Sequence, residues 1–336
     1  MTNQRVPMFP RDGAGSFKLP STKEGAIQRM VHLGDFMEVY TPEESFKIQT
    51  PESVDPARTN ANTMWVVAKV ADVGSTSPII ARTIIQAHDI LRDRMVLKDD
   101  ARITIHKLML KIKNNLLQCE IAQNIYLESE RKAENLFSST DQPANEKAYK
   151  NFPVIQSIDE KITNFLIPAR RVVTDVLQVP GFFWNLKKQH STLENLINKE
   201  LIPLLGKDHR MVNFFTSIVP DISRIVNFRN GQEHINTTKG TPLVIRNFFL
   251  LPTNEVHVPI WNLKNEQPTS IVDELPIMLN NLLIFAETML IACIDSNLPD
   301  FPPMLMQQIE TPKPLCPVRY ELVIDASKFQ LHTNES

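Results

Sequence analysis

The chain has 336 residues, of which 42% are hydrophobic and 22% charged, so it can form one large domain or two ordinary ones with a sizeable core. Its net charge of −2 excludes a protein that coats nucleic acid with its whole surface, and any nucleic-acid site must be a local patch. Nine glycines argue against a glycine-rich nucleotide-binding fold, and three widely separated cysteines support neither a disulfide framework nor a zinc site. We therefore expect a reduced, cytoplasmic protein with no cofactor or metal.

Residues 1–75 contain many turn-forming residues and little hydrophobic periodicity, so we expect a mostly irregular N-terminal arm. The first residues have no apolar core and do not indicate a signal peptide. Helical spacing starts near Pro78, a residue suited to a first turn, and we expect a helical domain over residues 76–300.

Hydrophobic periodicity predicts four long helices in this domain. They cover about 99–137, 153–178, 209–229 and 270–296. In the first of them the apolar residues alternate in steps of four and three, which predicts one buried seam. The seam consists of Ile105, Met109, Ile112, Leu116 and Cys119. The third contains Pro220, which predicts a bent or split helix.

Two of the helical segments need interpretation. The shorter one begins at Ser191, which is a suitable N-terminal cap. The last long helix is apolar enough over 277–294 to suggest a membrane span. Because Asn280, Asn281 and Glu287 interrupt it, we interpret it instead as a helix buried in protein and expect no membrane.

After the third long helix the hydrophobic period changes to that of strands. Residues 241–251 and 255–263 are β-like, and Pro252-Thr253-Asn254 join them, which predicts an antiparallel hairpin. Residues 318–325, in a C-terminal segment covering 301–336, predict one possible further strand. The expected fold class is mainly α, with a four-helix core, additional helices and a small antiparallel β appendage.

Arg229 and His234, at the end of the third helix, carry the chemistry on which the functional prediction depends. Arg229 offers a planar, permanently charged set of donors for phosphate oxygens, and His234 can accept or carry a proton near neutral pH. RNA supplies its own nucleophile in the 2′-hydroxyl, so these two groups suffice to cleave it without a metal. Residues five apart lie about 140° apart on an ideal helix, so we expect the helix to end between them, at Gly231.

The segment Arg229-Asn230-Gly231-Gln232-Glu233-His234 resembles the R-x(4–6)-H motif of the HEPN superfamily (higher eukaryotes and prokaryotes nucleotide-binding). The resemblance implies a HEPN-like four-helix core, with Arg229 and His234 as the catalytic pair and Asn230 as a supporting residue. It also implies a metal-independent endoribonuclease that acts on RNA as a homodimer. In this family such enzymes serve as toxins or antiphage-defence effectors, with a possible regulatory protein partner.

Four other residues are weaker candidates. Lys239 and Arg246 closely follow the motif and are expected to contact RNA phosphates. Glu233, beside His234, is expected either to raise the pKa of the imidazole or to repel RNA. Glu287 lies inside an apolar helix and requires a partner, which we expect to be Arg229 unless the carboxylate faces solvent.

An alternative interpretation of the motif is structural. Arginine and asparagine at a helix end often form a C-terminal device, in which the cation faces the helix dipole and the amide binds loose carbonyls. The alternative function is therefore a non-catalytic helical module that binds a nucleotide, RNA or a protein partner. Arg170-Arg171 and Lys187-Lys188 could flank an RNA groove, although such basic pairs more often lie on solvated faces.

Overall fold

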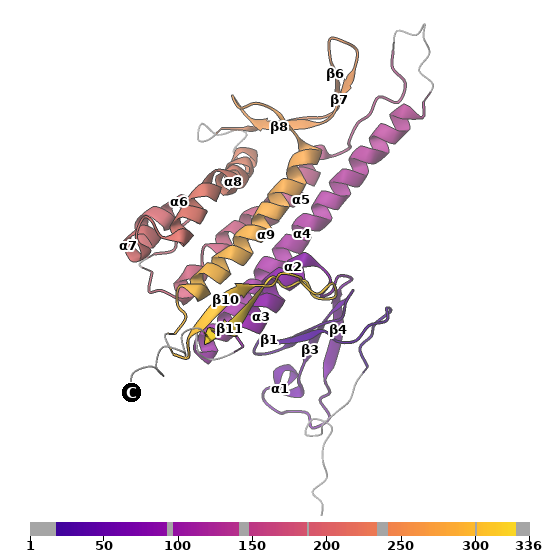
Figure 1. Ribbon diagram of the computed structural model, residues 1–336. Coiled ribbons are helices and arrows are strands. Elements are labelled where there is room, and N and C mark those ends of the chain that lie inside the picture. Colours follow the sequence, from indigo (N-terminus) through magenta and orange to yellow (C-terminus); the bar gives the residue numbers. More distant parts are fainter. Residues whose placement is uncertain are drawn as a thin grey trace, which may run out of the picture. The chain divides into compact units, whose positions relative to one another are not determined.

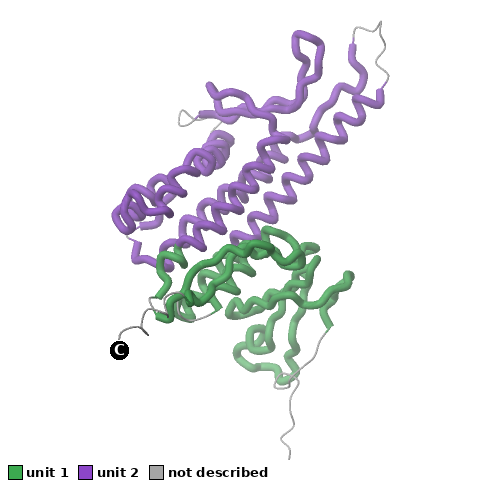
Figure 2. Tube along the Cα trace, in the orientation of Figure 1, with its two compact units in different colours: residues 1–110, 293–336 green, residues 111–292 purple. Residues whose placement is uncertain are grey.

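The computed structural model describes residues 18–92, 97–140, 148–186, 188–233, 241–299 and 301–326 (Figure 1). The chain divides into two compact units (Figure 2). Unit 1 comprises residues 1–110 and 293–336, and unit 2 comprises residues 111–292. These boundaries differ from the expected ones near residues 75 and 300, because two long helices each contribute residues to both units.

The expected fold class, mainly α with a four-helix core, additional helices and a small β appendage, is wrong. About 49% of the structure is helical and 16% is strand, and the strands form four small antiparallel sheets, so the fold is mixed α and β. The strands contain two to six residues each. Such short strands, separated by turn-forming residues, produce little periodicity in the sequence, and this is why the N-terminal ones were not predicted.

The segment expected to be an irregular arm contains a four-stranded antiparallel sheet with the order β1-β2-β3-β4. Its strands are β1 (Arg29–His32), β2 (Met37–Tyr40), β3 (Ser45–Gln49) and β4 (Val66–Ala71). The short helix α1 (Pro51–Val54) follows β3. One face of the sheet buries Val39, Phe46 and Ile48, against which Trp65 packs. The hydrophobic effect of this small core holds the N-terminal part of unit 1 together.

The rest of unit 1 is a short helical segment and a two-stranded sheet. The helical segment comprises α2 (Pro78–Ile80), the π-helical turn η2 (Ala81–Ile85) and α3 (Gln86–Ile90). The sheet pairs β10 (Met304–Gln308) with β11 (Tyr320–Ile324), which confirms the strand predicted over 318–325. Buried Gln86 accepts hydrogen bonds from the backbone N–H groups of Arg319 at 2.8 Å and Tyr320 at 3.1 Å. This amide therefore fastens β11 to α3.

Unit 2 contains the four long helices that periodicity predicts. They are α4 (Asp99–Ser138), whose first residues belong to unit 1, α5 (Ile158–Val176), α8 (Arg210–Glu233) and α9 (Ile271–Asp295). Every residue of the seam predicted on α4 is fully buried. The Cys119 thiol of α4 points to the Phe165 carbonyl of α5 at 3.7 Å, and the rings of Phe215 on α8 and Phe285 on α9 lie 6.1 Å apart. Pro220 lies inside α8, which is continuous through it.

The apolar helix α9 is long and apolar enough to cross a membrane by length and composition. In the structure, 61% of its most apolar 18-residue window is buried inside the protein. Glu287, which interrupts this window, is itself only 1% exposed. This burial is typical of a helix that packs on other segments of the protein.

Short helices connect α5 to α8. They are η3 (Val179–Phe182), α6 (Leu193–Leu196), η4 (Ile197–Leu201) and α7 (Ile202–Leu205). The prediction that Ser191 caps this segment is wrong by one residue. The Thr192 hydroxyl accepts a hydrogen bond from the Asn195 backbone N–H at 3.3 Å, as an N-terminal cap does.

The predicted hairpin after α8 is confirmed. The strands β5 (Leu243–Arg246) and β8 (Ile260–Leu263) pair with each other, and nearer the turn the strands β6 (Phe249–Leu250) and β7 (Val256–His257) form a second pair. The strand β9 (Thr269–Ser270) pairs with β8 and completes a sheet with the order β5-β8-β9. Trp261 of β8 anchors the hairpin, because its ring lies 4.8 Å from that of Phe228 on α8 and its Nε1 donates to Glu274 on α9 at 2.6 Å.

Candidate functional site

The last turn of α8 carries the first five residues of the motif, but the helix does not end at Gly231. It continues to Glu233, so the predicted helix end is wrong. Gly231 is buried, and a Cβ at this position would lie 2.6 Å from the Thr241 carbonyl oxygen and 2.9 Å from the Leu243 nitrogen. Glycine is therefore required here because the chain leading into β5 passes directly over the helix.

Arg229 is held within the last turn by an ion pair. Its guanidinium donates to the Glu233 carboxylate one helical turn later. The Arg229 side chain is only 16% exposed, whereas that of Glu233 is 49% exposed. A surface pair with this spacing contributes about 0.3–0.5 kcal/mol, so Glu233 aims the guanidinium without binding it tightly. A phosphate that arrives at Arg229 can replace Glu233 as the acceptor.

Asn230 faces solvent beside this pair. Within the described residues it makes no hydrogen bond, so Glu233, rather than Asn230, orients Arg229. A cation near a helix C-terminus is also favourable in the field of the helix dipole, as the structural interpretation of the motif requires. The described geometry is therefore compatible with both interpretations of Arg229.

Gln232 fixes the last turn of α8 to α5. Its side-chain amide donates to the Thr163 hydroxyl and to the Asp159 carbonyl oxygen, the latter at 3.4 Å. Helices α5 and α8 also pack along their length. The position of Arg229 relative to α5 is thus set by a side-chain hydrogen bond as well as by apolar packing.

Arg170 on α5 lies within electrostatic reach of the motif. Burial lowers the pKa of Arg170, and the negative charge of Glu233 acts in the opposite direction. Its guanidinium also points to the Ser191 carbonyl oxygen, at 3.4 and 3.3 Å from its two terminal nitrogens. The motif therefore has a second arginine nearby, which the sequence suggested only as part of an isolated basic pair.

Beside Arg170 lies a hollow that we call the basic groove, with a volume of about 410 Å³. Helix α4 contributes Lys111, Asn114 and Asn115, and α5 contributes Arg170, Arg171 and Asp175. Asp175 accepts a hydrogen bond from Asn115 at 3.3 Å, and its burial raises the pKa of its carboxyl. Lys111 and Arg171 are exposed and form no ion pair within the described residues. The groove therefore offers an excess of positive charge.

The other expected site residues are His234, Lys239, Arg246 and Glu287. His234 and Lys239 lie outside the described residues. Arg246 is on β5, where its guanidinium stacks on the Phe249 ring at 3.5 Å. Glu287 is buried on α9 and has an interaction within the protein, so the expectation that it faces solvent is wrong. Its expected pairing with Arg229 stays a prediction, and the contact found for the Arg229 guanidinium is with Glu233.

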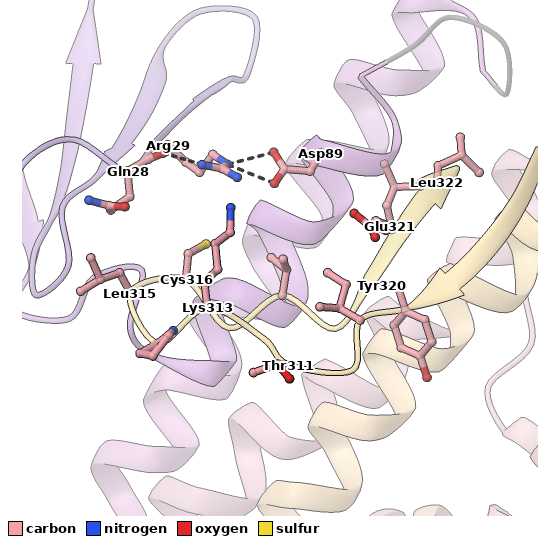
Figure 3. A pocket seen from close by; sticks show the side chains of 14 residues that line it. Gln28, Arg29, Asp89, Thr311, Lys313, Leu315, Cys316, Tyr320, Glu321 and Leu322 are labelled. Carbon is pink, nitrogen blue, oxygen red and sulfur yellow. Dashed lines mark hydrogen bonds and ion pairs between the residues drawn. The ribbon is translucent and has the colours of Figure 1, made fainter. Parts of the chain in front are cut away.

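Unit 1 has a separate cavity of about 680 Å³ between α3 and the segment before β11 (Figure 3). Figure 3 shows Arg29 of β1 opposite Asp89 of α3, and Arg29 Nε lies 3.1 and 3.0 Å from the two carboxylate oxygens. Lys313 and Cys316 line the same cavity. Burial raises the pKa of the Cys316 thiol, so this cysteine is a poor nucleophile. These residues come from three distant segments, so no local pattern in the sequence identifies them.

Titratable side chains do not gather into a metal-binding group in the described part of the chain. No three His, Cys, Asp or Glu residues come close enough there to hold a metal ion. Cys119, Cys293 and Cys316 are buried and form no disulfide.

No family model matches the sequence, and neither a curated protein nor a solved structure matches it significantly. The HEPN resemblance therefore depends on the six residues from Arg229 to His234, and the geometry of the last turn of α8 is the structural information that bears on it.

Proposed function

We propose that the chain is a metal-independent endoribonuclease in which Arg229 and His234 are the catalytic residues. The observation that carries the proposal is the anchored last turn of α8. Glu233 aims Arg229, Gln232 binds the turn to α5, and His234 follows Glu233 directly in the chain. A catalytic group must be held by its surroundings in this way, because small displacements of a catalytic group reduce the rate strongly.

The proposed reaction is an intramolecular transesterification of RNA. His234 takes the proton of the 2′-hydroxyl, the 2′-oxygen attacks the adjacent phosphorus, and the bond from phosphorus to the 5′-oxygen breaks. The imidazolium returns a proton to the departing 5′-oxygen. Arg229 donates to the non-bridging oxygens, where negative charge develops in the transition state. The products are a 2′,3′-cyclic phosphate and a 5′-hydroxyl.

Resemblance to the HEPN motif alone supplies the biological setting. It adds to the proposal a homodimer in the cytoplasm, a role as a toxin or an antiphage-defence effector, and a regulatory protein partner. The molar mass of the purified chain, measured by light scattering, tests the dimer. A mass near 38.4 kDa would exclude it and leave the chemistry of Arg229 and His234 as a separate question.

The direct test is cleavage of labelled RNA in excess EDTA, followed by end-group analysis. Wild type should release 2′,3′-cyclic phosphate ends, and Arg229→Ala and His234→Ala should each lower the rate at least a hundredfold. Arg131→Ala on α4 and His32→Ala on β1 are matched controls at exposed positions, and both should cleave at the wild-type rate. Equal cleavage by all five proteins, or by none, would reject the proposal.

A second candidate function is that of a non-catalytic module that binds a nucleotide, and the cavity of unit 1 favours it. Its volume of about 680 Å³ lies in the range of small-molecule sites. Lys313 is exposed there and forms no ion pair within the described residues, so it can meet an anionic group. Calorimetric titration with ATP and AMP tests this function. A measurable affinity that Lys313→Ala weakens tenfold would support it, and no heat of binding would dismiss it.

A further inference from the structure

The basic groove lies near a second hollow, which is formed by residues that directly follow α5. This hollow has a volume of about 300 Å³, and Gln178, Trp184 and Lys188 are among the residues that line it. Gln178 joins the two, because its side-chain amide points to Asp175 in the basic groove at 3.4 Å and to the Thr174 carbonyl at 3.3 Å. Because Gln178 lines one hollow and contacts residues that line the other, we treat the two hollows as one path over the surface.

Charge is distributed unevenly along this path. It contains the cations Lys111, Arg170, Arg171 and Lys188 against the single carboxylate of Asp175, although the whole chain has a net charge of −2. Burial raises the pKa of the Asp175 carboxyl, whereas Lys111, Arg171 and the hydrogen bond from Asn115 act in the opposite direction, so two of the cations offset the charge of this carboxylate. This is the local basic patch that a nucleic-acid site requires on an acidic protein.

The path also contains an aromatic surface. Trp184 is only partly buried and lines the second hollow, and its ring lies 6.4 Å from that of Phe183. A groove that combines cations with partly exposed aromatic rings suits single-stranded nucleic acid, because the cations follow the phosphates and the rings stack on unpaired bases. A duplex keeps its bases stacked on each other and cannot use Trp184 in this way.

The other end of the path reaches the motif. Glu233 acts electrostatically on Arg170, and Gln232 binds Thr163, which precedes Arg170 on α5 by about two helical turns. Thr163, Arg170 and Thr174 are seven and four residues apart, so they lie along one face of the helix. The stretch from Thr163 to Thr174 measures about 16 Å along the axis, which accommodates roughly five stacked nucleotides.

We propose that this surface of α4, α5 and the segment after α5, from Arg170 to Trp184 and Lys188, is the track that binds single-stranded RNA and leads it to the last turn of α8. Lys111, Arg170 and Arg171 contact phosphates, and Trp184 stacks on a base. The direction of the track towards Arg229 rests on the proposed ribonuclease function, whereas binding by the groove does not.

The experiment uses a fluorescein-labelled, 2′-O-methylated 12-nucleotide RNA and the full chain. The methyl groups remove the nucleophile, so binding is measured apart from cleavage. The double variant Lys111→Ala/Arg171→Ala should bind at least tenfold more weakly in fluorescence anisotropy, with a salt slope smaller by about 1.4. Trp184→Ala should weaken binding about tenfold, and Trp184→Phe should restore most of it. Lys132→Ala, a matched control on α4 outside the groove, should change the affinity less than twofold.

Failure of the track and failure of the ribonuclease are distinguishable. Equal affinities of wild type and the double variant, undetectable binding by wild type, or equal affinity for a 12-base-pair duplex would overturn the track. Cleavage that still depends on Arg229 and His234 would then leave the ribonuclease intact. Conversely, groove-dependent binding without any cleavage would retain the track and reject the enzyme. If both hold, the double variant should raise KM for unmodified RNA and change kcat little.

Discussion

Gln232 on α8 donates a hydrogen bond to the hydroxyl of Thr163 on α5, across 69 residues of sequence. The bond holds the turn that carries Arg229 against the helix that carries Arg170 and Arg171. It links the two parts of the molecule that the proposed function requires, namely the group that stabilises the transition state and the surface that binds the substrate.

Removal of this bond should reduce catalysis more than stability. Thr163→Val keeps the shape of the side chain and removes the acceptor, at a cost of about 1 kcal/mol to unfolding. We expect kcat for RNA cleavage to fall at least tenfold, because the last turn of α8 loses its attachment. Thr104→Val removes a hydroxyl that donates to the Asp100 carbonyl within α4, and it should leave kcat unchanged. Wild-type kcat in Thr163→Val would show that the bond does not position the site.

Loss of the Glu233 charge should strengthen RNA binding. Glu233 competes with phosphate for Arg229 and offsets the charge of Arg170. In Glu233→Gln the Kd for the 2′-O-methylated RNA should fall about threefold at low salt, and the gain should shrink as salt screens it. Glu128→Gln is the matched control, since Glu128 also pairs with a cation four residues away, at an exposed site. An unchanged or weaker affinity in Glu233→Gln would place Arg229 and Arg170 outside the RNA contact.

Gly231 should not tolerate even a methyl group. In an open helix, Gly→Ala stabilises by about 1 kcal/mol, but at Gly231 the new Cβ would collide with backbone atoms of Thr241 and Leu243. We therefore expect Gly231→Ala to lower the free energy of unfolding by about 2 kcal/mol or more. Among the described residues, a Cβ at Gly181 meets nothing within 4 Å, so Gly181→Ala should be neutral or stabilising. Denaturant titration of both variants decides the sign, and a stabilised Gly231→Ala protein would contradict the close approach of the chain before β5.

Long helices were predictable because a periodic signal repeats many times along them. The seam of α4 recurs over four turns, and every residue in it is buried. The hairpin was predictable for a local reason, because Pro252-Thr253-Asn254 separate two β-like runs. The N-terminal sheet lacks such repetition. Its last strand, β4, is exposed or half-exposed throughout, so burial imposes no alternation on its sequence.

In the candidate site, too, a local sequence pattern identifies some residues, whereas others come together only in the folded structure. Arg229 and His234 were selected because six consecutive residues carry a recognisable pattern. The hydrogen bond of Gln232 with Thr163 and the electrostatic interaction of Glu233 with Arg170 join positions far apart in the chain, and nothing local in the sequence identifies them. Glycine at 231 is typical of a helix end, but here it is required because the backbone of Thr241 and Leu243 passes close to it, and that approach is not visible in the sequence.

Acid should destabilise the protein through His106. This side chain is 4% exposed, its ring lies 5.7 Å from that of His88, and burial, together with His88, lowers the pKa of His106 to about 4. The unfolded chain, with an ordinary pKa near 6.5, binds a proton first. His106 therefore has no effect of this kind above pH 6.5. As pH falls from 6.5 towards 4, the preference of the unfolded chain for the proton lowers the free energy of unfolding by up to about 3 kcal/mol.

The His106→Gln variant tests this sign. Between pH 7.5 and 4.5, wild type should lose more thermal stability than His106→Gln. His32→Gln, at an exposed position on β1, should follow wild type over the same range. Parallel pH profiles of wild type and His106→Gln would show that the buried histidine does not control acid stability.

Glu130 on α4 should have the opposite pH dependence, because its carboxyl prefers to stay protonated. The residue is 3% exposed, and burial raises its pKa to about 7, with further contributions from Glu134 and from Asp273 on α9. The unfolded chain releases this proton near pH 4.5, so the stabilising contribution is complete below pH 4.5 and disappears as pH rises through 7.

Glu130→Gln removes the ionisation and should raise the melting temperature by several degrees at pH 8, and by little at pH 5. Glu128→Gln, exposed two residues earlier, should give no gain at either pH. If the difference in melting temperature between Glu130→Gln and wild type is the same at pH 5 and pH 8, Glu130 is ionised without cost in the folded protein.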